Sequence, residues 1–347
     1  MSAWRPEIDT VRAVAVAAVV LAHATAGGSD AFPPGTGLQA LYHVFHHLSA
    51  FAVPVLVWVC AVVWTVRYRE GRGKPMPFYG DTLRSLAAPA AAAWGIYLLA
   101  DRAGTNIGFE ALAPIAALLQ LALVFPFAFI LCKNRERAVR IFLAAAWAVQ
   151  IGFWAYQAWS DPIPYRNAIA PTYVGLFATG LWVGLRYEAA VERLNRHAGR
   201  ISAVCAVSAA VYVLSVWRAQ PGAGTFLPLP PAATEAVFQL YGLFAGLELL
   251  RSAKNMTEQS AFWRRVTVPL GIGWLGIYLI HPVFLAFWES IVPETIHPAA
   301  HLARTAGGAI AAAAATLGVV FTYRGRLRPR LPFVPNDSGE VGRPAAG

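Results

Sequence analysis

The sequence predicts an all-α membrane protein: a polytopic helical bundle of about ten transmembrane helices, with both termini in the cytoplasm. Three observations predict this fold: the composition, the length of the apolar runs and the distribution of positive charge. Of the 347 residues, 57% are hydrophobic and only 13% are charged, and the mean hydropathy is +0.51. Soluble domains carry about 25% charged residues because their surface is wet. We therefore expect lipid to surround most of this chain.

Runs of about 20 apolar residues are long enough to cross a bilayer. Ten such segments follow one another, at residues 12–29, 48–66, 83–100, 112–132, 139–158, 170–185, 201–217, 235–250, 268–289 and 301–322. Several of them contain proline, which membrane helices tolerate when neighbouring groups satisfy the freed backbone. No linker or repeat divides the series. We expect residues 1–325 to form one membrane domain and residues 326–347 to form a disordered cytoplasmic tail.

Positive charge alternates from loop to loop. The N-terminus, every second loop and the tail hold 24 of the 28 Lys and Arg residues, and the exceptions are Arg102, Arg166, Arg218 and Arg304. Short cytoplasmic loops are the ones that hold Lys and Arg in membrane proteins. The alternation therefore predicts an even number of spans with both ends inside. It also explains the net charge of +10 without a nucleic-acid partner.

The first apolar run has a second interpretation. Arg5 and the alanine-valine run that ends at Ala22-His23-Ala24 resemble a cleavable secretion signal. The run also carries Asp9 and Arg12, so we expect it to be retained as the first membrane helix. The cysteines have no paired spacing and predict small buried side chains rather than disulfides or metal ligands; they are Cys60, Cys132 and Cys205.

Ionisable side chains within membrane spans are costly, so each is a candidate functional residue. Arg12 and His23 are eleven residues apart, about 16 Å along a helix and close to three whole turns, which places both on one face. Alternatively, Arg12 anchors the helix at the cytoplasmic surface and His23 caps its outer end. Tyr278 and His281, about thirteen residues into the ninth span, lie at a similar depth and would line one cavity with His23. Alternatively, His281 bonds a carbonyl freed by Pro282.

Together these segments resemble a known family. Ile8-Asp9-Thr10-Val11-Arg12, followed after ten residues by His23, is similar to the opening of the acyltransferase type 3 family of bacterial membrane O-acyltransferases. Tyr278-Leu279-Ile280-His281-Pro282 resembles its late Tyr-Leu-x-His-Pro segment, and Leu176-Phe177-Ala178-Thr179-Gly180 resembles its Phe-x-x-Gly span. The resemblance covers about residues 5 to 325.

The resemblance implies an enzyme of the bacterial inner membrane that moves an acyl group, often acetyl, from cytoplasmic acyl-CoA to a hydroxyl of a glycan or lipid-linked sugar. Acyl-CoA would be a co-substrate, and no bound cofactor is implied. His23 would act as the catalytic base, since an imidazole titrates near neutrality. Arg12 and Arg84 would hold the anionic end of the donor, where a guanidinium suits phosphate. His281 and Tyr278 would contact substrate.

Two departures from the family pattern bear on the donor and the substrate. Where the family carries Arg-x-x-Arg before the third span, this chain has Asp81-Thr82-Leu83-Arg84. Where the family carries Ser-Gly-Phe in the second span, this chain has Val59-Cys60-Ala61. Donor binding at Arg84 is therefore open, and so is the identity of the substrate.

Other polar residues complete the list of candidates. His43, His46 and His47 lie before the second span. His43 and His47 are four apart and share a helical face, but no carboxylate cluster accompanies them. We therefore expect a substrate contact, with His47 as the candidate, or an interfacial role, rather than a metal site. Glu248 is expected to pair with Arg251, and Glu289 either orients a histidine or lies at the interface. Trp154, Tyr156, Trp159 and Trp288 are typical of an interfacial aromatic belt.

A transporter is the alternative class of function. A transporter could use intramembrane His and Arg residues as a relay. Transporters are expected to show repeat symmetry and paired broken helices. The sequence has no evident internal repeat, which favours the enzyme. The partners expected are acyl-CoA, an acceptor and membrane lipids, and the oligomeric state is left open.

Overall fold

The computed structural model describes residues 5–26, 32–33, 35–69, 74–102, 112–160, 163, 166–217, 227–292 and 298–327. Across these residues every regular element is helical, which confirms the predicted all-α class. The α-helices are α1 (Pro6–Thr25), α2 (Gly37–Ser49), α3 (Ala52–Arg67), α4 (Pro75–Thr82), α5 (Ala88–Arg102), α6 (Ala113–Cys132), α7 (Glu136–Trp159), α8 (Val174–Leu185), α9 (Tyr187–Arg196), α10 (Ala198–Val216), α11 (Pro231–Gln259), α12 (Ala261–Ile272), α13 (Trp274–Ile291) and α14 (Pro298–Leu327). Shorter elements are the π-helical η2 (Leu83–Ala87) and the 3-10 turns η4 (Arg166–Ala168) and η5 (Ala170–Thr172).

Within the described residues, seven stretches of helix are long and apolar enough to cross a membrane. The predicted count of ten is therefore not confirmed. The predicted segments at 170–185 and 235–250 fall on α8 and α11, which are not among these seven. α8 has only 12 residues. α11 carries Glu235 and Glu248 and packs against α1, α3, α7 and α10, so protein rather than lipid surrounds much of it.

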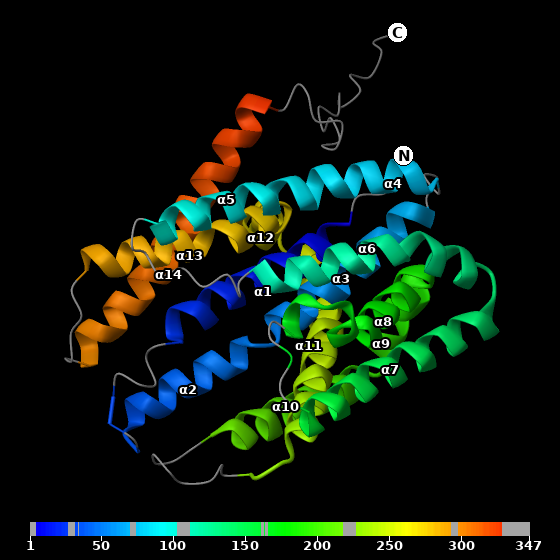
Figure 1. Cartoon of the computed structure of the whole chain (residues 1–347), viewed down its shortest axis with the longest axis horizontal. Helices are drawn as coiled ribbons and strands as arrows, with labels where there is room; N and C mark the ends of the chain where they lie inside the picture. Colours follow the sequence, from blue (N-terminus) through cyan, green and yellow to red (C-terminus); the bar gives the residue numbers. More distant parts are fainter. Residues whose placement is uncertain are drawn as a thin grey trace.

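The predicted second span at 48–66 is two helices. α2 ends at Ser49 and α3 begins at Ala52. Pro54 explains the break, because proline has no N–H to bond the carbonyl four residues earlier and its ring clashes with that turn. α2 lies against α1 (Figure 1). It carries three histidines, and His46 bonds the Ala22 carbonyl near the end of α1.

The predicted ninth span at 268–289 is also divided. α12 ends at Ile272, and Gly273 separates it from α13. His281 is therefore the eighth residue of its helix, not about the thirteenth as the sequence predicted. Pro282 lies inside α13, which continues to Ile291.

α1 runs through the middle of the bundle and contacts α2, α3, α11, α12, α13 and α14 (Figure 1). Glycines allow the closest helix approaches. A Cβ on Gly271 of α12 would overlap the backbone carbonyl of Asp9, and a Cβ on Gly180 of α8 would overlap the carbonyl of Trp58 in α3. The glycine of the mid-chain motif is thus explained by packing, since it brings α8 onto the fully buried Trp58.

Ion pairs between helices join segments that the charge alternation places on the same side. Arg5 pairs with Glu188 at 2.7 Å, and Arg186 pairs with Glu136 at 3.2 Å; all four belong to the Arg-rich side. On the opposite side, Arg166 pairs with Glu235 at 3.7 Å. The two ends of the bundle agree with the alternation, and which end faces the cytoplasm stays a prediction. Arg218 and residues 328–347 of the predicted tail lie outside the described residues.

Candidate active site

His23 lies in the last turn of α1, where its side chain is exposed. The ring of His281, from α13, meets it edge-on, with the ring centroids 4.9 Å apart at an interplanar angle of 82°. His281 itself is fully buried. The expectation that these two histidines share one site is therefore met by the geometry, even though they are 258 positions apart in the chain.

A backbone hydrogen bond sets the tautomer of His281. Its Nδ1 lies 2.9 Å from the carbonyl oxygen of Ile277. A carbonyl can only accept, so Nδ1 is the donor, and in the neutral ring Nε2 is then an acceptor. Nε2 is buried and has no hydrogen-bond partner among the described residues. The alternative interpretation, in which His281 bonds a backbone carbonyl, is thus also correct, and it leaves a free lone pair on the ring that packs against His23.

The three histidines of α2 extend this site. His46 Nδ1 donates to the carbonyl of Ala22, the residue before His23, at 2.9 Å. The His46 and His47 rings are 4.9 Å apart, and the His47 and His43 rings are 4.3 Å apart. We call His23, His281, His46, His47 and His43 the histidine cluster. The described residues contain no group of three or more His, Cys, Asp or Glu placed to hold a metal ion.

Tyr278 lies one helical turn before His281 and is 3% exposed. Its ring centroid is 6.3 Å from that of His281 and 6.4 Å from that of Trp274. Tyr278 therefore packs against His281 in the protein interior. Arg84, by contrast, is exposed in the π-helical segment η2.

Arg12 lies at the other end of α1, where it is 9% exposed. Its guanidinium is 3.4 Å from a carboxylate oxygen of Asp9 and lies over the Trp274 ring at 5.9 Å. Cys60, at the position where the family carries Ser-Gly-Phe, lies within electrostatic reach of Arg12. Arg12 is therefore an interior cation held among α1, α3 and α13, and not a residue of the open surface.

The residues around Arg12 form a buried polar group, which the sequence did not predict. Thr10 and Thr267 share a hydrogen bond of 2.7 Å between α1 and α12. Tyr187 donates to the carboxylate of Glu7 at 2.9 Å. Burial, together with the Glu7 carboxylate, holds the pKa of Tyr187 above its usual value, so the phenol stays protonated and keeps this bond. The Pro6 end of α1 is thus fixed by partners on α9 and α12.

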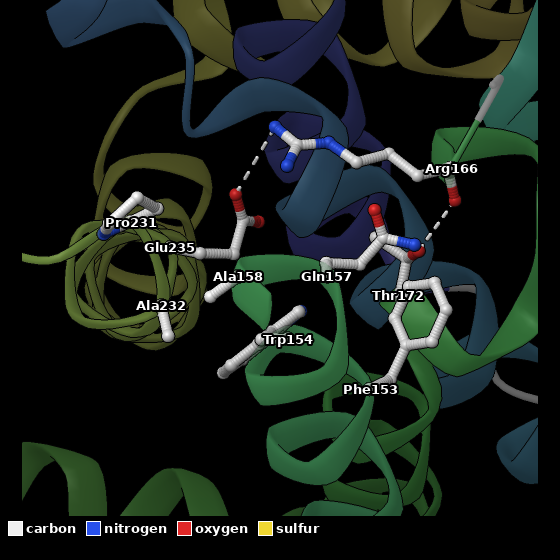
Figure 2. Close-up of a pocket in the computed structure, with 9 residues that line it drawn as sticks. All are labelled: Phe153, Trp154, Gln157, Ala158, Arg166, Thr172, Pro231, Ala232 and Glu235. Atoms are coloured by element: carbon white, nitrogen blue, oxygen red, sulfur yellow. Dashed lines mark hydrogen bonds and ion pairs between the residues drawn. The ribbon is translucent and has the colours of Figure 1, made fainter. Parts of the chain in front are cut away.

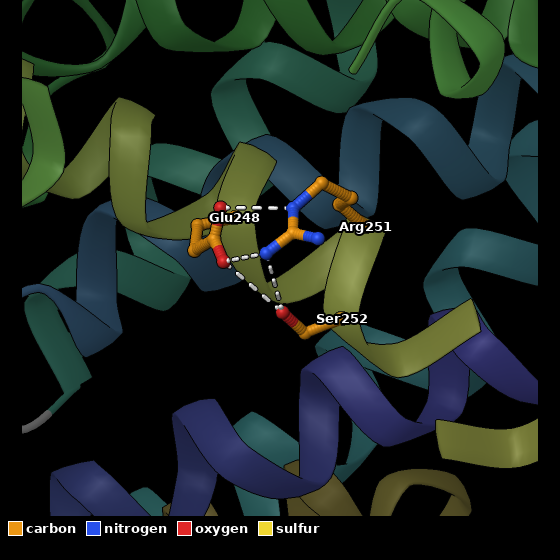
Figure 3. Close-up of polar contacts among 3 residues, drawn as sticks. All are labelled: Glu248, Arg251 and Ser252. Carbon is orange, nitrogen blue, oxygen red and sulfur yellow. Dashed lines mark hydrogen bonds and ion pairs between the residues drawn. The ribbon is translucent and has the colours of Figure 1, made fainter. Parts of the chain in front are cut away.

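Glu248 pairs with Arg251 on α11, as the sequence predicted (Figure 3). Ser252 also donates to Glu248 at 3.2 Å, so the carboxylate has partners within its own helix. Glu289 is exposed at the end of α13, which agrees with an interfacial placement. Cys60 and Cys132 are buried as expected, whereas Cys205 is only partly buried.

Trp154 was predicted to lie in an interfacial belt, and this is wrong. It is 5% exposed and lines a small, water-sized pocket between α7 and the start of α11 (Figure 2). The Trp154 side chain faces the protein interior, whereas Trp159, on the same helix, is 95% exposed. The Arg166–Glu235 ion pair closes one side of the pocket. The sequence does carry a signal for this pocket. Glu235 opens a predicted apolar span, and Arg166 lies earlier in the chain on the same predicted side of the membrane.

The fold and the site together define a multi-pass membrane protein with a histidine-rich polar site at one end of its first helix. Residues 5–324 match the family described as an acyltransferase domain, which is the family that the motifs resemble. The match covers most of the chain, so the chain belongs to the acyltransferase type 3 family and is an acyltransferase that moves groups other than aminoacyl groups. No curated protein and no solved structure matches the chain.

Proposed function

We propose that the protein transfers an acyl group, in the first instance acetyl, from acyl-CoA to a hydroxyl of a glycan or lipid-linked sugar, in the bacterial inner membrane. One observation carries the proposal: an exposed histidine at the end of the first helix is backed by a buried histidine 4.9 Å away whose free nitrogen is an acceptor. Family membership supplies the class of reaction. The donor and the acceptor are our assignment.

His23 is the proposed general base. It takes the proton of the acceptor hydroxyl as the oxygen attacks the thioester carbonyl carbon. The new C–O ester bond forms, the C–S bond breaks, and the CoA thiolate leaves with the proton that the imidazolium returns. A base with a pKa near the working pH suits both halves of this transfer. The exposed side chain of His23 lets two substrates reach it.

His281 is the proposed positioning residue. Its Nδ1–H is bound to the Ile277 carbonyl, so Nε2 can accept an N–H from the neighbouring imidazole. An imidazole that donates through one nitrogen keeps its other nitrogen as the base. The buried ring of His281 would therefore select the tautomer of His23 and stabilise the imidazolium that forms during attack.

Arg12 is proposed to hold the anionic part of the donor. It is about 16 Å from His23 along α1, so a long donor could place its phosphates near one and its thioester near the other. The separation of Arg12 from Asp9, 3.4 Å, exceeds the roughly 2.7–2.9 Å of a strong charge-assisted hydrogen bond, so a phosphate can compete for the guanidinium. Arg84, exposed in η2, is a second cation for the donor.

The test is release of CoA thiol from acetyl-CoA by the purified protein in lipid nanodiscs, with and without candidate glycans. We expect His23→Ala to lower the rate by about 10²- to 10⁴-fold, the usual contribution of a general base. His197→Ala is the matched control, because His197 is an exposed histidine at the start of α10. If His23→Ala is as fast as the wild type, His23 is not the base.

A further inference from the structure

His301 is a buried histidine that the proposed mechanism does not use. It lies in the first turn of α14 and is 6% exposed. Its Nδ1 is 2.6 Å from the hydroxyl oxygen of Tyr42 in α2, 259 positions earlier in the chain. The same hydroxyl oxygen is 3.0 Å from that of Thr305, one turn further along α14. Buried polar groups are costly unless they are hydrogen-bonded, so these three side chains tie α2 to α14 through one buried polar contact.

Aromatic packing covers this contact. The ring of Phe32, which follows α1 in the chain, meets that of His301 edge-on with the centroids 4.9 Å apart. It also stacks on the ring of Tyr42, with the centroids 5.8 Å apart. Phe32 and Tyr42 are themselves buried. A hydrogen bond away from water is electrostatically stronger, and its loss leaves a costly unpaired group. The contact therefore holds Tyr42, and with it α2, in one orientation.

α2 connects this contact to the candidate active site. Tyr42 and His46 are four residues apart, so they lie one turn apart on the same side of the helix. His46 Nδ1 donates to the carbonyl of Ala22 at 2.9 Å. Ala22 is among the last four residues of α1, whose carbonyls lack the next turn of helix as a donor. His46 supplies a donor from a second helix, and it thereby holds the turn of α1 that carries His23.

α14 braces α13 as well. The Trp288 indole N–H of α13 donates to the carbonyl of Arg304 in α14 at 2.9 Å. The Trp288 ring lies against Gly307 and Gly308, where an added Cβ would come within 2.9 and 2.8 Å of ring atoms. α13 carries His281, the buried ring beside His23. One helix is therefore joined to both of the helices that bring a histidine to the end of α1.

We propose that Tyr42 and His301 are positioning residues for the acyl transfer. Their hydrogen bond sets α2 so that His46 holds the last turn of α1, and with it the proposed base His23. Both residues act through His46 and not on the reacting atoms. The inference rests on the proposed function for the reaction that it serves, whereas the link from α14 to the end of α1 rests on the geometry alone.

The first experiment measures CoA thiol release from acetyl-CoA by Tyr42→Phe in nanodiscs, with the candidate glycans used for the wild type. Phenylalanine keeps the ring and loses only the hydroxyl. We expect kcat to fall about 10- to 100-fold, the cost of a displaced catalytic group, with the KM for acetyl-CoA within about twofold of the wild type. Tyr156→Phe is the matched control, because Tyr156 is 57% exposed on α7. An unchanged kcat in Tyr42→Phe, or an equal fall in the control, would overturn the proposal.

Two further variants test the route through His46. In a His46→Ala background, Tyr42→Phe should change kcat by no more than about twofold, because its route to His23 is already lost. Independent effects of the two substitutions would contradict a positioning role. His301→Asn places an amide near the position of Nδ1 and should keep a higher kcat than His301→Ala. Equal kcat values in these two variants would show that the hydrogen bond to Tyr42 does not serve the reaction.

Hydrogen–deuterium exchange distinguishes failure of this inference from failure of the proposed function. Without acetyl-CoA, the amides of residues 22–26 should exchange faster in Tyr42→Phe than in the wild type, because a less firmly held turn opens more often. Those of α7 should not change. Faster exchange at 22–26 in a protein without His23-dependent CoA release rejects the proposed function and supports the link from α14 to α1. Unchanged exchange there overturns that link, whatever the activity.

Discussion

The two ends of α1 contrast in how their polar residues are held. At the Pro6 end, Glu7, Thr10 and Arg12 are buried, and each has a hydrogen-bond or ion-pair partner. At the Thr25 end, His23 is exposed, and the ring beside it, His281, has a nitrogen without a partner. One end of the helix is thus fixed by satisfied polar groups, and the other keeps unsatisfied groups where substrates can arrive. The difference teaches that one helix both anchors the bundle and carries the chemistry.

The largest expected effect is on the anchored end. Gly271→Ala places a Cβ against the Asp9 carbonyl, and a backbone atom cannot move aside. Overpacking of this kind costs about 1–3 kcal/mol and occasionally more. We expect a much lower yield of monodisperse protein and a lower Tm in detergent. Gly152→Ala, where a Cβ meets nothing within 4 Å, is the control and should leave the Tm equal or slightly raised. Equal Tm values for both variants would contradict the close approach of α12 to α1.

The second prediction concerns the reactive end. His281→Ala should lower the turnover rate by about 10²-fold, since a misplaced catalytic group costs about that much. The KM for acetyl-CoA should change little. His281→Gln can still accept through its amide oxygen and should recover part of the rate, which a residue that only fills space would not do. Steady-state kinetics of the two variants measure this. Equal rates in both would show that His281 is packing alone.

The contrast between the ends was only partly predictable from the sequence. The spacing of Arg12 and His23 placed both on one face of a helix, and local periodicity suffices for that. The meeting of His281 with His23 was also expected, because predicted topology gave both a similar depth. The depth itself was wrong by several residues, since the break at Gly273 depends on tertiary packing of α12 against α1.

The features that the sequence does not predict depend on contacts between residues that are far apart in the chain. The buried partners Thr10 and Thr267 are 257 positions apart, and hydropathy contains no signal for such a pair. Trp154 is predicted at the interface because tryptophan is common there. In the structure its side chain lies on a buried face of α7 and lines a pocket. The count of ten spans is not confirmed for a related reason: α11 packs against several helices, so its polarity is not a measure of lipid contact.

The third prediction asks whether the anchored end also serves the donor. Arg12→Lys keeps the charge but loses the planar fork that suits phosphate. We expect the KM for acetyl-CoA to rise about tenfold, equivalent to roughly 1.4 kcal/mol, with the acceptor KM unchanged. Arg193→Lys is the control, because Arg193 is exposed on α9. A change confined to Tm, with the same KM in both variants, would make Arg12 a purely structural cation.

The smallest expected effect is that of a single hydrogen bond between α1 and α12. Thr10→Val and Thr267→Val each remove one partner of the 2.7 Å contact. Thr267→Val should cost about 1 kcal/mol, because the Thr10 hydroxyl stays buried and loses its acceptor. Thr10→Val should cost less, because the Thr267 hydroxyl still donates to the Trp263 carbonyl. The double variant should cost less than the sum, since neither hydroxyl then remains unpaired, and the coupling free energy should be about 0.5–1 kcal/mol or more. Thermal unfolding of the four proteins measures the cycle. Additive losses would mean that the two hydroxyls are held separately, and the anchoring of α1 would then rest on Gly271 and the Glu7–Tyr187 bond alone.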